Sequence, residues 1–520
     1  MPDSLTQLSS YRALASHLKE IKSHNMREMF AQDDNRFSIF SVQFESLLFD
    51  YSKNRINAAT IEKLVALYDE CDVPAWRDKM FAGEKINSTE DRAVQHTALR
   101  NLEDKNSALT KKQLAVLLLI EAFAGKVEQS NITDVVNIGI GGSHLGPLFV
   151  CDALQEMSKP NLNVHFVANV DAEEINRVLS ELNPVNTLFI VTSKSFTTKE
   201  TLINAKYARN WSLKNTGLKN EDHFVAVTAN PEKARKFGIE EENIFPMWDE
   251  IGGRYSLWSA VGLSIALFLG IEAFKSLLSG AHAMDEHFIS APADENIPVL
   301  MGLLDIWNQH FLGATTHAIL PYDVRLTYLP AYLQQMMMES NGKSVDREGN
   351  VLSVPSSLIV FGDVGTNAQH SFFQLLHQGT HIVSCDFIGI AKPAHDNQAQ
   401  HDMLLANMIG QSQALMMGQT LEELGGVEHA EHKVFPGNRI SNTIFLNELN
   451  PYSLGMLLAM YEHKTFVYGV LLNINSFDQM GVELGKQFAN SLLDKIKDQN
   501  SVTDEDSSTN GLIDFYKQNK

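Results

Sequence analysis

The sequence has few cysteines and no long apolar run. Cys71, Cys151 and Cys385 are its only cysteines, an odd number without CxxC spacing, so we expect neither a disulfide framework nor a thiolate zinc site. A reducing cytoplasm suits this pattern. The longest apolar run, at 257–271, is shorter than the roughly 20 residues that cross a bilayer. The N-terminal segment lacks the continuous apolar core of a signal peptide, so no membrane partner is expected.

The chain is also poor in positive charge. It has 42 Lys and Arg against 63 Asp and Glu, which gives a net charge of −21. This charge would repel nucleic acids and anionic membranes, so neither is expected as the main partner. A small anionic substrate would need a local positive site. The length of 520 residues and the 44% hydrophobic content fit a globular protein of two or three domains.

Short β-branched segments alternate with helical segments after residue 125. Such alternation predicts βαβ units and parallel sheets. A polar stretch at 290–298 separates two cycles of this pattern. We expect strands at 134–140, 163–169, 186–192 and 223–229 in the first cycle, and at 317–322, 357–362 and 381–387 in the second.

The pattern therefore predicts an α/β protein with four regions. Residues 1–125 form a helical N-terminal region, residues 126–285 a first α/β domain, and residues 286–490 a second, larger one. Residues 491–520 are a polar tail with a final helix.

The stretch NIGIGGSHLGP at 137–147 joins a strand to a helix through glycines. Glycines let the backbone approach a ligand closely, and amides at a helix start attract anions, which makes Gly142 and Ser143 candidate contacts. The spacing is not the G-x-G-x-x-G of dinucleotide sites. A tight turn without a ligand is the alternative.

The stretch SKSFTT at 193–198 follows an apolar strand and precedes a helix. Hydroxyls, one lysine and the helix amides together favour a phosphate-binding loop over simple N-capping, since one cap needs only one hydroxyl. The stretch contains no GxxxxGK[ST], so a phosphomonoester is favoured over a nucleoside triphosphate. The candidate residues are Ser193, Lys194, Ser195, Thr197 and Thr198.

Several charged residues are candidates for chemistry. Arg254 follows two glycines, where it would stabilise an oxyanion or simply pair with a carboxylate. Glu339 follows three methionines and precedes the turn-like Ser340–Gly342, so it is either a helix-end charge or a base beside a poorly hydrated pocket. Taken alone, His370 and Lys486 are typical of a structural histidine and a solvated lysine. The histidine-rich stretches are polar, and no metal site is expected.

Several motifs together resemble the phosphoglucose isomerase family. The family pattern D-x-I-G-G-R-[FY]-S is similar to residues 249–256, and F-D-Q-x-G-V-E-L-G-K is similar to residues 477–486. The resemblance runs in order over nearly the whole chain. Further matches lie at 86–101, 139–147, 193–201, 320–343, 365–380 and 437–444.

The resemblance implies a fold and an activity. The implied fold has two flavodoxin-like sugar-isomerase (SIS) α-β-α sandwich domains with extra N-terminal and C-terminal helices. The implied protein is a homodimer without cofactor or metal. It interconverts the sugar phosphates glucose 6-phosphate and fructose 6-phosphate through a cis-enediol.

Roles follow for matching positions. The resemblance implies that Glu339 is the proton-transferring base and that Arg254 stabilises the enediolate. It also implies ring opening by Lys486 and by His370 from the partner subunit, with Glu200 orienting that histidine. The implied substrate contacts are Gly142, Ser143, Ser193, Lys194, Ser195, Thr197, Thr198, Gln335 and Gln479.

Two positions depart from the family pattern. Met337 stands where an Asp is common, which removes a charge close to Glu339, and Ile440 stands where Pro is usual. Two other functions stay open at this point. One is a non-catalytic phosphosugar sensor; the other is a different aldose–ketose or amino-sugar isomerase, because an anion loop and an enediol base do not fix stereochemistry at C2.

Overall fold

The structure is a computed structural model that describes residues 5–104, 107–217, 223–498, 500 and 502–520. The chain divides into two compact units, Met1–Phe477 and Asp478–Lys520, and each is described by itself. Among the described residues, no helix has the length and apolar character needed to cross a membrane.

The first sheet of the larger unit is entirely parallel, with strand order β4-β3-β5-β6-β7. Numbered from its first strand, this is the 2-1-3-4-5 order of flavodoxin-like folds. Strand order therefore reverses between β3 and β5. The strands are β3 (Asp134–Ile138), β4 (Asn163–Val167), β5 (Thr187–Thr192), β6 (Phe224–Thr228) and β7 (Ile244–Pro246).

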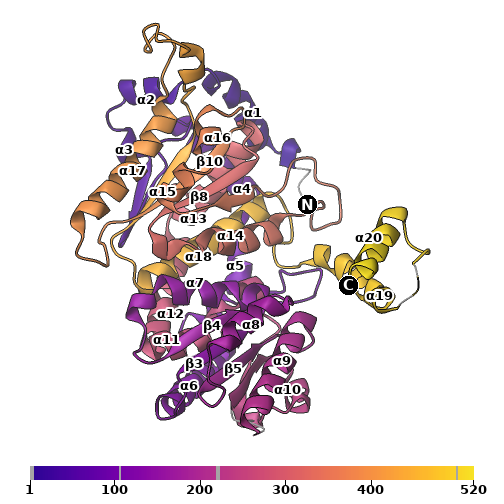
Figure 1. Cartoon of the computed structure of the whole chain (residues 1–520). Helices are drawn as coiled ribbons and strands as arrows, with labels where there is room; N and C mark the ends of the chain where they lie inside the picture. The colour runs from indigo at the N-terminus through magenta and orange to yellow at the C-terminus, as the bar shows by residue number, and fades with distance from the viewer. Residues whose placement is uncertain (1–4, 105–106, 218–222, 499, 501) are drawn as a thin grey trace. The chain divides into compact units, whose positions relative to one another are not determined.

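Both faces of this sheet are buried. Val135 and Ile190 belong to one hydrophobic core, whereas Val136 and Val191 belong to another on the opposite face, as expected from the alternation of side chains along a strand. Figure 1 shows the helices beside this sheet. One core includes residues of α6 (Ala108–Glu128), α7 (Leu145–Ala153) and α11 (Leu263–Leu269), and the other includes residues of α8 (Ala172–Ser180), α9 (Lys199–Thr216) and α10 (Pro231–Phe237).

The second sheet has six strands in the order β1-β2-β11-β10-β8-β9. Strands β8 to β11 are parallel and repeat the order of the first sheet, whereas β2 pairs antiparallel with β11 and β1 with β2. The strands are β1 (Ser41–Phe44), β2 (Leu47–Asp50), β8 (Thr316–Tyr322), β9 (Ile359–Gly362), β10 (Val383–Ile390) and β11 (Ser441–Leu446).

Helices cover both faces of the second sheet as well. Leu320 and Phe387 pack in a core with α15, α16 and α17, and Ile319 and Ile388 pack on the opposite face in the core that contains α13 and α18. The helices of this half are α12 (Ile271–Ser290), α13 (Ile297–Ile306), α14 (Leu329–Leu333), α15 (Gly365–Gln369), α16 (Phe373–Gln378), α17 (Gln398–Met417) and α18 (Pro451–Leu471).

The chain ends are helical. The N-terminal helices are α1 (Ser9–Ile21), α2 (Met26–Gln32), α3 (Arg36–Ile39), α4 (Ala58–Glu70) and α5 (Val73–Phe81), and the smaller unit contains α19 (Glu483–Lys497) and α20 (Ser507–Gln518).

The predicted α/β class and all seven predicted strands are confirmed, with ends shifted by a few residues. The prediction that residues 1–125 are helical was wrong at 41–50, where β1 and β2 extend the second sheet. Strands β7 and β11 were also missed. The compact units divide after Phe477, and the expected domain bounds at 125, 285 and 490 stay predictions.

Helix α18 carries three consecutive ionisable residues into the protein interior. Glu462, His463 and Lys464 are each 1% exposed or less. The buried Arg100 donates to Asp285 from Nε (2.7 Å) and Nη2 (2.6 Å), and to Glu462 from Nη1 (2.6 Å). The Nε2 atom of His463 lies 2.6 Å from Oδ1 of Asp285. Burial raises the pKa of Glu462 to about 7.

Lys464 belongs to a second buried charge network. Its Nζ lies 3.1 Å from Asp305 Oδ2 and 3.8 Å from Asp386 Oδ2. His317 Nε2 lies 2.9 Å from the same Asp386 oxygen. Each charge thus has an opposite charge or a hydrogen-bonding group beside it, as burial of ionised groups requires.

We expect Arg100→Met to lower the free energy of unfolding by about 3–5 kcal/mol, because two buried carboxylates lose their shared cation. Urea unfolding would measure this loss. The matched control is Lys236→Met, which removes an exposed pair with Glu232 and should leave the urea midpoint unchanged. Equal effects from the two variants would contradict a structural role for the buried network.

Candidate functional site

Two loops meet where the strand order of the first sheet reverses. The stretch with Gly142 follows β3, and the stretch with Ser193 follows β5. In open α/β sheets, ligands bind outside the carboxyl ends of the strands at such a point. Asn137 at the end of β3 ties the two loops, because it donates to Ser143 O (3.1 Å) and accepts from Thr192 Oγ1 (3.2 Å).

The glycine loop after β3 lies directly against the segment that carries Arg254. It forms a short helical turn, η3 (Gly141–Ser143). A Cβ on Gly142 would lie 1.9 Å from Gly253 O and 2.8 Å from Arg254 N, and one on Gly141 would lie 2.9 Å from Gln335 Nε2. Gly142 therefore has a steric reason to be glycine, and the Gln335 amide lies beside the loop.

The loop after β5 presents hydroxyls at the start of α9. Ser193 is buried and donates to Thr198 Oγ1 (3.1 Å), whereas the hydroxyls of Ser195 and Thr197 lie 2.6 Å apart on exposed residues. Among the described residues, the structure records no acceptor for the backbone N–H groups of Ser195, Thr197 and Thr198. Unpaired amides at a helix N-terminus suit an anion.

Arg254 lies in η7 (Gly253–Trp258) and is 4% exposed. Its Nε donates to Ser340 Oγ (2.7 Å), and its Nη2 donates to the carbonyl of Ser476 (2.6 Å). Its Nη1 lies 3.6 Å from Glu339 Oε2. Two strong hydrogen bonds therefore fix the guanidinium while one edge lies near the carboxylate.

Glu339 ends a π-helical segment, η11 (Gln334–Glu339), which continues directly from α14. Such widened turns are rare and are frequent at functional sites. Met336 and Met337 are buried behind it, and the Glu339 side chain is 20% exposed. Its Oε2 atom is buried and has no hydrogen-bond partner. The carboxylate therefore lies at the protein surface with one poorly solvated oxygen.

Ser340 is a site residue that the sequence reasoning missed. Besides Arg254 Nε, its Oγ also bonds the hydroxyl of Tyr255 (2.9 Å). The prediction of a turn at Ser340–Gly342 was wrong at its start, because Ser340 and Asn341 are still helical. No local pattern signals this role, since the partner of Ser340 is 86 residues away in the chain.

Four further predicted residues lie on other elements of the chain. His370 is exposed at the end of α15, and Glu200 lies in the first turn of α9. Among the described residues, neither side chain forms an ion pair with Glu339. Gln479 and Lys486 belong to the smaller unit, where Lys486 Nζ donates to Glu483 (2.8 Å).

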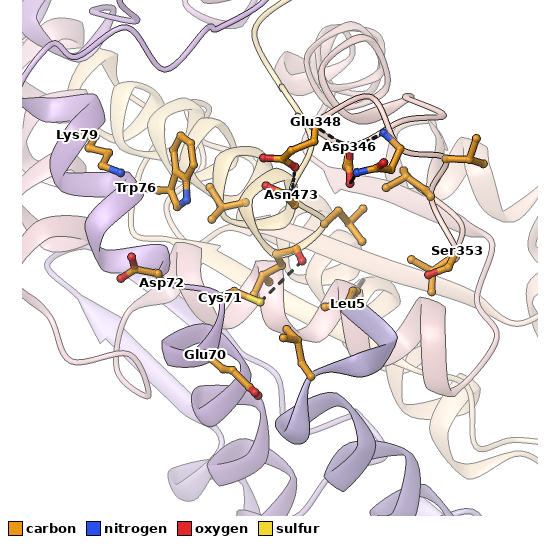
Figure 2. Close-up of a pocket in the computed structure, with 18 residues that line it drawn as sticks. Leu5, Glu70, Cys71, Asp72, Trp76, Lys79, Asp346, Glu348, Ser353 and Asn473 are labelled. Atoms are coloured by element: carbon orange, nitrogen blue, oxygen red, sulfur yellow. Dashed lines mark hydrogen bonds between the residues drawn. The ribbon is translucent and has the colours of Figure 1, made fainter. Parts of the chain in front are cut away.

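A separate cavity of about 650 Å³ contains none of the predicted site residues. Figure 2 shows its acidic lining. Glu70 accepts from the backbone N–H groups of Ser9 and Ser10, and Glu348 accepts from Asn473 Nδ2 (2.6 Å). These carboxylates are thus used within the chain. Among the described residues, no group of three or more His, Cys, Asp or Glu side chains is arranged to hold a metal ion.

Comparison with known proteins decides the family. The sequence model of the family described as phosphoglucose isomerase matches residues 50–513. The chain belongs to the phosphoglucose isomerase family. It is 48% identical to a glucose-6-phosphate isomerase of Chlorobium luteolum (99% of this chain, 98% of the relative) and 47% identical to one of Helicobacter pylori strain HPAG1 (99% of both). A crystal structure of a glucose-6-phosphate isomerase from Chlamydia trachomatis superposes with a TM-score of 0.89 at 33% identity, covering 100% of both chains.

The two departures from the phosphoglucose isomerase pattern are both buried apolar residues. Met337 is 6% exposed and Ile440 is 1% exposed, and both pack in the largest hydrophobic core. Met337 thus contributes apolar core packing two residues before Glu339, at the position where the pattern commonly has a carboxylate.

We expect Gly142→Ala to lower the free energy of unfolding by about 1–3 kcal/mol, because the added methyl must displace the backbone of Gly253. Chemical denaturation would measure the change. Gly125→Ala is the control: its Cβ would meet nothing within 4 Å, and alanine in a helix should stabilise the protein by up to about 1 kcal/mol. A Gly142→Ala variant as stable as the wild type would contradict the tight contact.

Proposed function

We propose that this chain interconverts glucose 6-phosphate and fructose 6-phosphate, with Glu339 as the base. After ring opening, the carboxylate takes the proton from C2 of the aldose and returns it to C1 of the resulting cis-enediol, while O1 gains a proton and O2 loses one, which yields the ketose. The observation that carries this proposal is the buried, unbonded Oε2 of Glu339 at 3.6 Å from Arg254 Nη1. Its lone pairs are available to accept a proton.

In this proposal Arg254 stabilises the negative charge that forms on the enediolate. An arginine keeps its proton at any working pH, so it does not compete with Glu339 for the transferred proton. Its bonds to Ser340 and Ser476 hold it in place before the reaction. A donor fixed in advance needs no reorganisation when the charge develops, which is the main source of electrostatic catalysis.

The sugar phosphate group would bind at the loop after β5. The hydroxyls of Ser193, Ser195, Thr197 and Thr198 and the main-chain N–H of Lys194 lie at the N-terminus of the 18-residue helix α9. Asn137 links this loop to the glycine loop with Gly142 and Ser143, because it bonds both Ser143 O and Thr192 Oγ1. Gln335 and Gln479 complete the proposed contacts to the sugar.

Ring opening would be carried out by His370 and Lys486, and we propose a homodimer in which His370 comes from the partner subunit. The exposure of His370 and the lack of a recorded contact to Glu339 within the described chain are consistent with a role across an interface. Glu200 would then orient the partner's histidine. A cytoplasmic location is proposed as well, since Cys71, Cys151 and Cys385 are free thiols.

We expect Glu339→Gln to lower kcat for fructose 6-phosphate by at least about 10²-fold, because the amide cannot accept the proton. Calorimetry should show that the variant still binds fructose 6-phosphate. The exposed Glu62→Gln is the control and should keep wild-type turnover. All assays would contain a chelator, which should leave wild-type turnover intact. A Glu339→Gln variant with near wild-type turnover would exclude the proton-transfer role.

Subunit mixing tests the shared site. Glu339→Gln and His370→Ala homodimers should each be inactive, whereas a heterodimer contains one site with both native residues and one site with neither. Random exchange of equal amounts should restore about a quarter of wild-type turnover. Each variant mixed with itself is the control. Sedimentation would verify the dimer, and exchanged heterodimers without turnover would contradict the contribution of His370 from the partner.

A further inference from the structure

The ammonium group of Lys194 is bonded to the segment that leads to Arg254. Its Nζ donates to the carbonyls of Asp249 (3.0 Å) and Ile251 (2.9 Å) and lies 3.7 Å from Asp249 Oδ1. Its side chain is only one-quarter exposed, and burial lowers its pKa. A lysine whose charge mainly served a ligand would not have two of its three N–H donors on backbone carbonyls.

The main chain of Lys194 is also held in place. Its carbonyl accepts from Ala229 N (2.9 Å) and Thr228 Oγ1 (3.1 Å) at the end of β6. The side chain therefore extends from a fixed point on the first sheet to the segment 249–251. That segment continues through Gly252 and Gly253 into Arg254.

The segment just before Arg254 has no regular structure of its own. Residues 249–252 lie in no helix or strand, and among the described residues the backbone carbonyls of Asp249 and Ile251 have Lys194 as their recorded partner. Charge-assisted hydrogen bonds are shorter and stronger than neutral ones. Two such bonds to alternate carbonyls restrict the path of the backbone just before the arginine.

We infer that Lys194 is a positioning residue that fixes the backbone before Arg254, and that its ammonium is not the main source of phosphate affinity. This inference rests on the proposed isomerase function of the same site. Phosphate affinity then comes from the hydroxyls and amide N–H groups at the start of α9. The exposed Asp249 carboxylate, 3.7 Å from Lys194 Nζ, further offsets the lysine charge near a bound phosphate.

The test compares Lys194→Met, Lys194→Arg and a control, Lys206→Met, which removes an exposed lysine from the following helix α9. For each protein, kcat and KM for fructose 6-phosphate are measured, together with the inhibition constant of inorganic phosphate. If Lys194 positions Arg254, Lys194→Met should lower kcat about 10- to 100-fold. The inhibition constant should change less than about threefold, and Lys194→Arg, which retains donors for both carbonyls, should recover most of kcat.

The opposite pattern would overturn the inference. If Lys194 binds the phosphate directly, Lys194→Met should raise KM and the inhibition constant of phosphate about tenfold or more while kcat stays within about threefold of wild type. The rise in thermal midpoint caused by inorganic phosphate gives phosphate affinity without turnover. That rise remains informative even if the wild type does not convert fructose 6-phosphate, an outcome that would contradict the proposed function instead.

If Lys194→Met does not fold, the same measurements are made on Lys194→Gln. The amide is neutral but can still donate to a carbonyl. Positioning predicts phosphate affinity within about threefold of wild type for this variant, whereas a direct charge role predicts the same large loss as for Met. Lys206→Met should match wild type in every measurement.

Discussion

The placement of the Arg254 guanidinium is the constraint on which the site depends. Its Nε donates to Ser340 Oγ and its Nη2 to the Ser476 carbonyl, and its Nη1 lies 3.6 Å from Glu339 Oε2. The separation is too long for a hydrogen bond, so the carboxylate keeps an unbonded oxygen beside a fixed positive charge. In the proposed reaction, this arrangement would leave Glu339 able to accept a proton while the charge of Arg254 is already in place.

The same constraint links the two halves of the larger unit. Arg254 follows the first sheet, whereas its partners Ser340 and Ser476 lie 86 and 222 residues further along the chain, around the second sheet. The glycine loop after β3 adds a third segment in direct backbone contact. These contacts of Arg254 therefore exist only when both sheets have folded and packed. A substitution in either half that shifts one of these segments would therefore change the position of the Arg254 guanidinium.

Sequence reasoning found the parts of this site but not the way they are joined. Strands β3, β5 and β10 were predictable because β-branched runs are local signals, whereas β1 and β2 have four residues each and are defined by pairing with β11. Glu339 was a candidate because a charged residue directly follows three apolar methionines. Ser340 did not, because one serine becomes an arginine acceptor only through a distant contact. His370 and Lys486 were named from family resemblance alone.

Helix α18 has a consequence for how precisely the core can be built. Its three consecutive ionisable residues meet different partners: Glu462 meets Arg100, His463 meets Asp285, and Lys464 meets Asp305. Successive helical positions are turned by about 100° from one another. Turning this helix by one residue would move Glu462 away from Arg100 and, in one of the two directions, place it against another carboxyl group, Asp285. The three pairs therefore specify the rotation of α18 about its own axis more strictly than apolar contacts alone would.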